Sequence, residues 1–392
     1  MIDSSENAIE AKILFVLCIF VLCGILTAGL WPFHAPRNNV KWLTKTNGLR
    51  FGRYGTVLSS QALAAPSSQY EEPCSIEIWL RSYRSYDTNT ILAFYRPGNT
   101  RQFSLHQSDS DLALQLGLPD EHIQAKTAGI VYGDDLFRTK ELLLVAIASG
   151  GEGTRIYVNG VLAKNIPNFR LSTLDCTGQL VLGTSPVVND TWSGELRGLA
   201  IYRQELSPAQ VARHFETWTT EGRPELGQDE RAPAFYAFDE HQGGTVHDRS
   251  GSGIDLHIPE RYMILSEKLL EPPWKEFYPA WSYWKNVGIN IGGFLPLGFC
   301  FCAYLTTSRL ISRPVLATII LGAATSLTIE LPQAFLPTRD SGMTDLITNT
   351  LGTGLGALLY LRNSTLFQEV LRRARLAIFG KISVYPSVQA SD

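Results

Sequence analysis

Four long apolar segments constrain the fold of this chain more than any other feature of its sequence. The first runs almost unbroken from Ile13 to Trp31, and three more follow at about 287–305, 314–335 and 346–361. An α-helix needs about 20 apolar residues to cross a bilayer, and these segments approach or reach that length. We therefore predict a multidomain membrane protein with four transmembrane α-helices and a polar domain between the first and the second.

A cleaved signal peptide is the alternative reading of the first segment. The residues before it are acidic, and only Lys12 lies near the membrane as a basic residue, unlike the basic start of a signal peptide. The segment also ends in Trp31-Pro32-Phe33, which is typical of an interfacial anchor. We expect an uncleaved anchor, with residues 13–33 as transmembrane helix 1.

Basic residues near these segments predict their orientation, because cytoplasmic loops of membrane proteins are enriched in Lys and Arg. Arg309 and Arg313 lie between the second and third segments, and a group of arginines follows the fourth. Residues 1–12 would then be a cytoplasmic N-terminus, and residues 366–392 a basic cytoplasmic tail. The tail begins either as a short amphipathic helix or as a frayed segment. The polar middle is expected outside the cytoplasm.

The polar middle, at about 38–262, has the pattern of an all-β domain. Short strand-like segments recur between turn residues, and Asn159-Gly160 is a strong hairpin signal. The expected strands are at 75–81, 155–158, 161–163, 179–183 and 196–202. One helix interrupts them, with Ser207 as its N-cap and Pro208 at its first position. This order predicts a β-sandwich.

Six cysteines divide between the apolar segments and the polar middle. Those in the apolar segments are expected to be small buried hydrophobic side chains: Cys18, Cys23, Cys300 and Cys302. Cys74 and Cys176 lie in the polar middle. They are a candidate disulfide if that region is outside the cytoplasm, and two free buried thiols are the equal alternative.

Charge and motifs exclude two classes of function. The formal net charge is −3 at pH 7, so no nucleic-acid-binding surface is predicted. The sequence has no CxxC, HExxH or Cys/His cluster that would predict a zinc site.

Polar residues interrupt the last two apolar segments, where ionisable groups are costly and usually have a reason to be present. Glu330 and Gln333 are three residues apart and lie on one helix face. A second stripe follows at spacings of four, three and four residues: Asp345, Asn349, Gly352 and Gly356. The hairpin brings Glu330, Arg339 and Asp345 towards one end of the helix bundle.

Three roles are open for this polar set. In a purely structural role, glycines four residues apart let helices pack closely, and the asparagines form hydrogen bonds across that contact. Alternatively, Arg339 suits a phosphate or carboxylate, such as a lipid headgroup or an undecaprenyl-type carrier of envelope glycan. In a catalytic role, Glu330 or Asp345 would be the general base and Arg339 the anion clamp. The candidate ligand-binding residues are Arg339, Glu330, Gln333, Asp345, Asn349 and Asn290.

This hairpin resembles the VanZ-like family of bacterial membrane proteins. A second signature on the preceding helix supports the resemblance: Asn290-Ile-Gly-Gly-Phe294-Leu-Pro296-Leu-Gly298-Phe299. The resemblance covers about residues 280–365, with transmembrane helices 2–4, and the end of the first helix. The family is named for a protein linked to resistance against the glycopeptide teicoplanin. The resemblance implies a multi-pass protein of the bacterial cytoplasmic (inner) membrane and does not settle its molecular activity. We expect a non-enzymatic envelope role.

The polar middle resembles the laminin-G-like, concanavalin A-type jelly roll over most of 50–218. The resemblance rests on the strand at 76–81, on Ile156-Tyr-Val-Asn-Gly160, and on the segments at 180–183 and 192–202. Such domains bind sugars, proteins or nothing. The segment at 234–253 resembles the opening strand of the same family but comes last, so we expect it to return and pair with the sandwich. An independent flap is the alternative.

The laminin-G-like resemblance also implies a calcium site at the sandwich rim. Calcium takes six to eight oxygen ligands, and the oxygen-rich candidates are Asp109, Asp111, Asp134 and Asp135. Solvated loop carboxylates are the alternative, and no other cofactor is expected. Exposed aromatic side chains would stack on sugars or form ordinary surface: Tyr83, Tyr86 and Tyr95.

The sequence thus predicts an outer or periplasmic sandwich that binds a glycan or a protein, carried by a membrane hairpin that recognises an anionic lipid-linked group. A membrane enzyme that modifies a lipid-linked envelope precursor is one alternative. A membrane-anchored scaffold that recruits a partner is the other.

Overall fold

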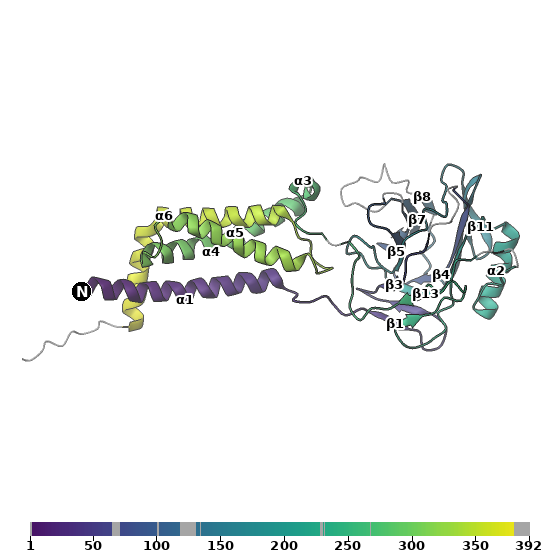
Figure 1. The fold of residues 1–392 in the computed structure, drawn as a ribbon, viewed down its shortest axis with the longest axis horizontal. Helices are drawn as coiled ribbons and strands as arrows, with labels where there is room; N and C mark the ends of the chain where they lie inside the picture. Colours follow the sequence, from purple (N-terminus) through teal and green to yellow (C-terminus); the bar gives the residue numbers. More distant parts are fainter. Residues whose placement is uncertain are drawn as a thin grey trace, which may run out of the picture. The chain divides into compact units, whose positions relative to one another are not determined.

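The computed structural model describes residues 2–64, 71–99, 102–117, 131–133, 135–227, 230, 232–266 and 268–379. The chain divides into two compact units (Figure 1). One unit is helical and combines Met1–His34 with Lys268–Asp392, and the other is the β-rich Ala35–Glu267.

The helical unit is built from four long helices and one short one. Helix α1 packs against α4 and α5, while α6 packs against α4 and α5 (Figure 1). The bounds are α1 Ile2–Leu30, α3 Pro273–Glu276, α4 Trp281–Ser308, α5 Pro314–Gln333 and α6 Met343–Phe379.

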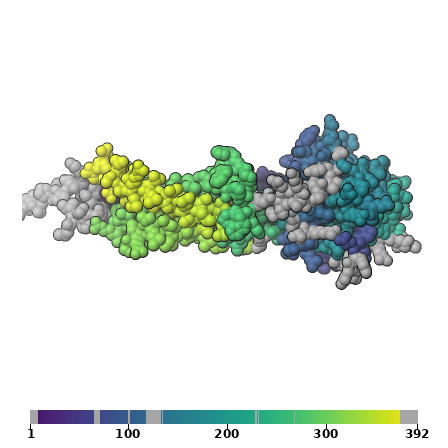
Figure 2. Space-filling view, turned by 90° about the horizontal axis from the view of Figure 1, so that it is seen from above, coloured from purple at the N-terminus to yellow at the C-terminus, as the bar shows by residue number. Residues whose placement is uncertain are grey.

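Three of the described helices are long and apolar enough to cross a membrane: Ile9–Leu30, Trp281–Ser308 and Pro314–Gln333. The protein is therefore a multi-pass membrane protein. Helix α6 is not among the three, although leucines such as Leu351 and Leu355 are exposed on it. Its surface runs in yellow along the helical unit in Figure 2. A fourth span at 346–361 stays a prediction.

Helix α6 changes direction after the predicted fourth span. Asn363 has a non-helical backbone, with φ −111° and ψ 16°, and the helix then resumes to Phe379. The start of the predicted tail is therefore helical up to that residue, whereas its amphipathic position on the membrane surface stays a prediction. Residues 380–392 and the side chain of Arg375 lie outside the described part.

Glycines let α4 and α6 approach closely. A Cβ atom added at Gly298 would lie 1.9 Å from the carbonyl oxygen of Thr353, and one at Gly352 would lie 2.3 Å from that of Ile291. No larger residue fits at these positions without moving a backbone. A Cβ atom added at Gly356 would lie 2.2 Å from the carbonyl oxygen of Leu295, so the spacing of Gly352 and Gly356 marks a helix–helix contact, whereas Gly288 and Gly292, at the same spacing on α4, have nothing within 4 Å.

The β-rich unit is a sandwich of two antiparallel sheets. The first has the order β1-β2-β13-β4-β9-β10-β11, with β14 on β13, and the second has the order β15-β16-β3-β12-β5-β6-β7-β8. The strands of the first are β1 Val40–Trp42, β2 Leu49–Phe51, β4 Cys74–Ser82, β9 Leu143–Gly150, β10 Gly153–Val158, β11 Val161–Ile166, β13 Gly194–Tyr202 and β14 Ala234–Tyr236. Those of the second are β3 Val57–Ser59, β5 Asp87–Tyr95, β6 Phe103–Asp109, β7 Asp111–Leu116, β8 Val131–Gly133, β12 Gln179–Leu182, β15 Thr245–Val246 and β16 Leu256–His257.

The hairpin turn and the helix N-cap that the sequence predicted are both present in the structure. The turn between β10 and β11 has φ 50° at Asn159 and φ 81° at Gly160, as a two-residue hairpin requires. Helix α2, Pro208–Glu221, begins at Ser207, whose side chain and that of Gln210 form a reciprocal capping box.

The last part of the sandwich unit returns to both sheets. Strand β14 pairs with β13 in the first sheet, and β16 pairs with β3 in the second. The expectation that this segment pairs with the sandwich is confirmed, and the independent flap is wrong. An isolated bridge between Arg37 and Arg261 also brings the two ends of the unit together.

Helix α2 covers the outer face of the first sheet. Strand β9 is buried along its whole length, because its alternate side chains face the sandwich core on one side and α2 on the other. Val211 and Trp218 are the buried apolar residues that α2 contributes to this contact.

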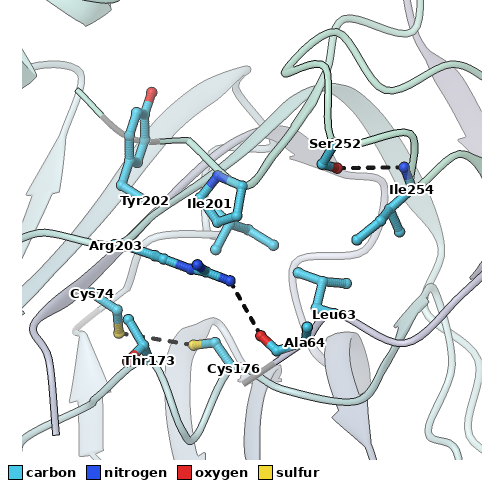
Figure 3. A pocket seen from close by; sticks show the side chains of 11 residues that line it. Leu63, Ala64, Cys74, Thr173, Cys176, Ile201, Tyr202, Arg203, Ser252 and Ile254 are labelled. Atoms are coloured by element: carbon cyan, nitrogen blue, oxygen red, sulfur yellow. Dashed lines mark hydrogen bonds between the residues drawn. The ribbon is translucent and has the colours of Figure 1, made fainter. Parts of the chain in front are cut away.

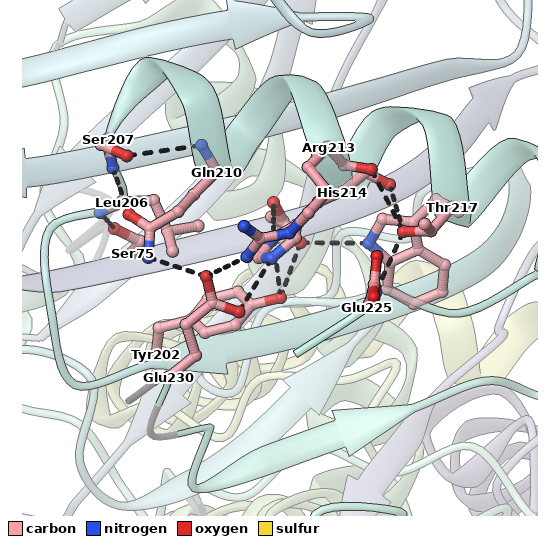
Figure 4. Close-up of polar contacts among 12 residues, drawn as sticks. Ser75, Tyr202, Leu206, Ser207, Gln210, Arg213, His214, Thr217, Glu225 and Glu230 are labelled. Carbon is pink, nitrogen blue, oxygen red and sulfur yellow. Dashed lines mark hydrogen bonds and ion pairs between the residues drawn. The ribbon is translucent and has the colours of Figure 1, made fainter. Parts of the chain in front are cut away.

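A buried polar network also joins α2 to the sheet (Figure 4). Nδ1 of His214 lies 2.9 Å from Oε1 of Glu77, and its Nε2 lies 3.1 Å from Oε2 of Glu230. Glu77 also accepts hydrogen bonds from the Tyr202 hydroxyl at 2.7 Å and from Nε1 of Trp218 at 3.0 Å. Burial alone lowers the pKa of His214, but its bonds with the two carboxylates and their charges outweigh burial and raise it.

Candidate functional site

The polar hairpin holds the end of helix α1. Gln333 donates from Nε2 to the carbonyl of Gly29 at 2.7 Å. Arg339 donates from Nε to the carbonyl of Trp31 at 3.1 Å, and its Nη2 donates to the same oxygen. The last carbonyls of a helix lack partners within the helix, so both side chains satisfy orphan acceptors.

Two asparagines join the other helices. Asn290 of α4 donates to Oδ1 of Asp345 in α6 at 2.6 Å. Asn349, one turn further along α6, donates to Oγ of Ser326 in α5 at 3.0 Å. Each of these two bonds links two helices.

Two carboxylates stabilise the start of α6, where free N–H groups favour negative charge. Glu330 is 1% exposed, and its Oε2 accepts the N–H of Gly342 at 3.0 Å. Oε2 of Glu276 accepts the N–H and the hydroxyl of Thr344, at 2.9 Å and 2.5 Å. Sequence reasoning missed Glu276, because it lies outside the hairpin and no periodic pattern marks it.

Arg339 is separate from the acidic residues of the set. Among the described residues no ion pair joins it to Glu330 or Asp345. Its side chain is exposed and its Nη1 makes no hydrogen bond to the described residues. The guanidinium of Arg339 can therefore still bind an anion. Elsewhere in the hairpin, Oδ1 of Asn349 is buried without a hydrogen-bond partner in the described part.

Aromatic side chains surround this end of the helical unit. Trp31, Trp274 and Trp281 are 63%, 79% and 81% exposed. Phe277 and Tyr283 pack edge to face, with ring centroids 5.3 Å apart. Trp and Tyr are enriched where a membrane meets water, so the arrangement fits the headgroup level of a bilayer.

The two cysteines of the sandwich lie together beside a hollow of about 250 Å³ (Figure 3). Their sulfur atoms are 3.8 Å apart, and both thiols are free and buried. The hydrogen bond with Cys74, followed by burial, raises the pKa of Cys176 well above its ordinary value. Cys176 is therefore an uncharged thiol at neutral pH, poorly suited to nucleophilic attack.

The calcium candidates do not form a ligand set in the described part of the chain. Oδ1 of Asp111 accepts the N–H of Asp135 at 2.7 Å, and Oδ1 of Asp135 accepts the hydroxyl of Ser110 at 2.7 Å. Asp109 is exposed, and no group of three potential ligands gathers among the described residues. Asp134 lies outside them.

A polar hollow of about 490 Å³ lies elsewhere on the sandwich. Three chain segments, one of which contains the start of β5, supply its lining, which consists of Arg53, Tyr54, Arg84, Asp87, Thr88, Asn89, Asn189, Asp190, Thr191 and Ser193. Sequence reasoning missed it, because segments far apart in the chain leave no periodic signal. Of the predicted sugar-stacking residues, Tyr86 is exposed, whereas Tyr83 lies under Arg50 and bonds to Glu195.

Two family models match this sequence. Residues 238–368 match the VanZ/LLP1 family, and residues 54–212 match the concanavalin A-like lectin/glucanases superfamily. The chain carries a VanZ/LLP1 region and a concanavalin A-like domain. Both resemblances drawn from the sequence are thereby confirmed. The VanZ/LLP1 match begins in the returning segment of the sandwich and contains α4, α5 and the polar hairpin.

Solved structures resemble the chain only distantly. The botulinum neurotoxin serotype D ligand-binding domain in complex with N-acetylneuraminic acid is 13% identical, covers 54% of this chain with 58% of its own, and has a TM-score of 0.36. A SAP-like pentraxin from Limulus polyphemus is 15% identical, with coverages of 59% and 96% and a TM-score of 0.34. Scores this low support no functional argument. No curated protein sequence matches the chain significantly.

Proposed function

We propose that this is a protein of the bacterial cytoplasmic membrane whose sandwich lies on the outer, periplasmic side. The VanZ/LLP1 region and the three membrane helices support this proposal. Arg309 and Arg313, between α4 and α5, favour a cytoplasmic position for that loop. The opposite ends of these helices, with Arg339 and the aromatic residues, then face outwards.

We further propose that the hairpin recognises an anionic lipid-linked group. The observation that carries this proposal is the exposed guanidinium of Arg339, which bonds to the Trp31 carbonyl while its Nη1 makes no hydrogen bond to the described residues. Glu330, Glu276 and Asp345 already accept hydrogen bonds from the protein. An arginine held in this way suits a phosphate oxygen, and the surrounding tryptophans fit the depth of lipid headgroups.

The sandwich would bind a glycan of the envelope. Its match to a superfamily of lectins and glucanases supports this role. The polar hollow adds a surface with the required chemistry, because amide, hydroxyl and arginine side chains bind sugar hydroxyls. The two units would then act on the same class of molecule, a lipid that carries a sugar.

Binding of a soluble lipid phosphate tests the hairpin proposal. The full chain in nanodiscs is titrated with farnesyl phosphate and with farnesol, which lacks the phosphate. We expect Arg339→Gln to weaken farnesyl phosphate binding at least tenfold, equal to about 1.4 kcal/mol. Gln333→Ala is the matched control, because it removes the other clamp on α1 but no charge. Equal binding by wild type and Arg339→Gln, or equal binding of the alcohol, would contradict the proposal.

One observation favours a catalytic alternative. Asn290 holds Oδ1 of Asp345, while Oδ2 makes no hydrogen bond to the described residues. Asp345 would then be the general base and Arg339 the anion clamp. Asp345→Asn should in that case abolish turnover of a lipid-linked precursor and preserve its binding. A scaffold would tolerate this change and fail only when the sandwich is removed.

A further inference from the structure

The polar hollow of the sandwich is built around an arginine that is fixed in place. Arg53 and Tyr54 form the tip of the turn Gly52–Gly55, which is closed by a 2.9 Å bond from the N–H of Gly55 to the carbonyl of Gly52. The guanidinium of Arg53 lies over the Tyr54 ring, 4.8 Å from its centroid. A cation held against an aromatic ring loses less freedom when it binds a ligand.

Tyr54 is itself held in a costly conformation. Its φ is 64°, in the left-handed region that a tyrosine rarely adopts. Its ring packs 5.4 Å from that of buried Tyr262, whose hydroxyl lies 2.9 Å from Oγ1 of Thr184. Strained backbone of this kind persists only where its surroundings fix it, and it gathers at ligand sites.

The two carboxylates of the hollow are already engaged. Oδ2 of Asp190 accepts the N–H and the hydroxyl of Thr90, at 3.0 Å and 2.6 Å, and Oδ1 accepts the N–H of Ser185 at 2.5 Å. Asp87 lies 3.4 Å from Nη1 of Arg84. Arg84 is thus paired with Asp87, whereas Arg53 makes no ion pair with a described carboxylate, so Arg53 is the cation of the hollow that remains available to a ligand.

We propose that this hollow binds an anionic sugar, whose carboxylate or phosphate pairs with Arg53. Its hydroxyl groups would bond to Asn89, Asn189 and Ser193, which line the same hollow. The inference rests on the proposed glycan-binding role of the sandwich and names the class of glycan. Arginine pairs with planar carboxylates and with phosphates through parallel N–H bonds.

Calorimetry with three sugars tests the inference on the full chain in nanodiscs. The probes are trigalacturonate, its neutral methyl ester, and glucose 1-phosphate. We expect Arg53→Gln to weaken binding of the acidic probe at least tenfold, or about 1.4 kcal/mol. The control is Arg170→Gln, which removes the same charge from an exposed position outside the hollow and should leave binding unchanged.

The outcomes distinguish the anionic class of the sugar from the more general glycan-binding role of the sandwich. Loss for trigalacturonate assigns a carboxylate ligand, and loss for glucose 1-phosphate alone assigns a phosphate. Equal binding of the methyl ester that does not depend on Arg53 would overturn the anionic class and keep a glycan-binding sandwich. Equal weakening by Arg53→Gln and Arg170→Gln would also overturn it. If none of the three sugars binds, both the inference and the glycan-binding role fail.

Discussion

The buried carboxylate of Glu77 offers a sharp test of how helix α2 is attached to the sandwich. Replacing Glu77 by Leu keeps most of the side-chain volume but removes the acceptor of three hydrogen bonds. The donors are His214 at 2.9 Å, the Tyr202 hydroxyl at 2.7 Å and Nε1 of Trp218 at 3.0 Å. All three donors are fully buried, so water cannot replace the lost partner.

The expected cost follows from these three donors. Leaving one buried donor unsatisfied costs about 1–3 kcal/mol, which sums to about 3–9 kcal/mol for the network. Neighbouring groups in one network are not additive, and the leucine gains some apolar burial, so we expect about 3–5 kcal/mol. This is a large share of the ~5–15 kcal/mol that stabilises a typical domain.

Hydrogen exchange measured by mass spectrometry on the full chain in detergent checks this value. Amides of α2, Pro208–Glu221, should exchange at least about a hundredfold faster in Glu77→Leu, since each tenfold equals about 1.4 kcal/mol. Glu141→Leu is the control at an exposed position and should change local stability by less than about 0.5 kcal/mol. Exchange of α2 within threefold of wild type in Glu77→Leu would refute the reasoning.

Three further predictions concern His214 and two other contacts, the Cys74–Cys176 pair and the approach of α4 to α6. Because its folded pKa is raised above 6.5, His214 stabilises α2 fully below pH 6.5, and this contribution is lost as the pH rises through the raised value. The amide exchange rate of α2, corrected for the intrinsic rates at each pH, should rise as this stabilisation is lost. A corrected rate that does not change with pH would contradict the prediction. Cys74 and Cys176, 3.8 Å apart, should form a disulfide in an oxidising compartment, seen as linked peptides without reduction; free, alkylatable thiols would contradict this. Gly298→Ala, whose Cβ meets a carbonyl of α6 at 1.9 Å, should lower the melting temperature, whereas Gly293→Ala, with nothing within 4 Å, should not.

Local signals predicted much of the fold. The apolar run at 314–335 corresponds to α5, Pro314–Gln333, because hydrophobic length alone determines a membrane helix. The capping box at Ser207 and the Asn-Gly turn at 159–160 act within a few residues, so they are visible in one sequence. The hydropathy of α6 is diluted by its polar stripe, and the fourth span stays a prediction for that reason.

The hairpin site was predicted only in part. Helical spacing predicted that Asp345 and Asn349 face the other helices, and Asn290 indeed bonds to Asp345. The partner of Arg339 was not predictable, because it is a backbone carbonyl 308 residues away in the chain, and every residue carries such a carbonyl.

The contacts that the polar side chains of the sandwich make could not be predicted from the sequence for a related reason. Asp111 and Asp135 are close together, as a calcium site would require, but they bond to a backbone N–H and to a hydroxyl. Acidic composition alone does not distinguish these two uses. The hollow around Arg53 depends on three chain segments meeting in space, and each segment by itself looks like ordinary surface.

We propose that the hairpin holds an anionic lipid-linked group. Native mass spectrometry of the full chain purified from bacterial membranes is the sharpest test of this proposal. The wild type is compared with Arg339→Gln and with Gln333→Ala. We expect one anionic lipid-linked species to co-purify with the wild type and with Gln333→Ala, and to be absent from Arg339→Gln. The same set of lipids on all three proteins, with equal folding, would contradict it.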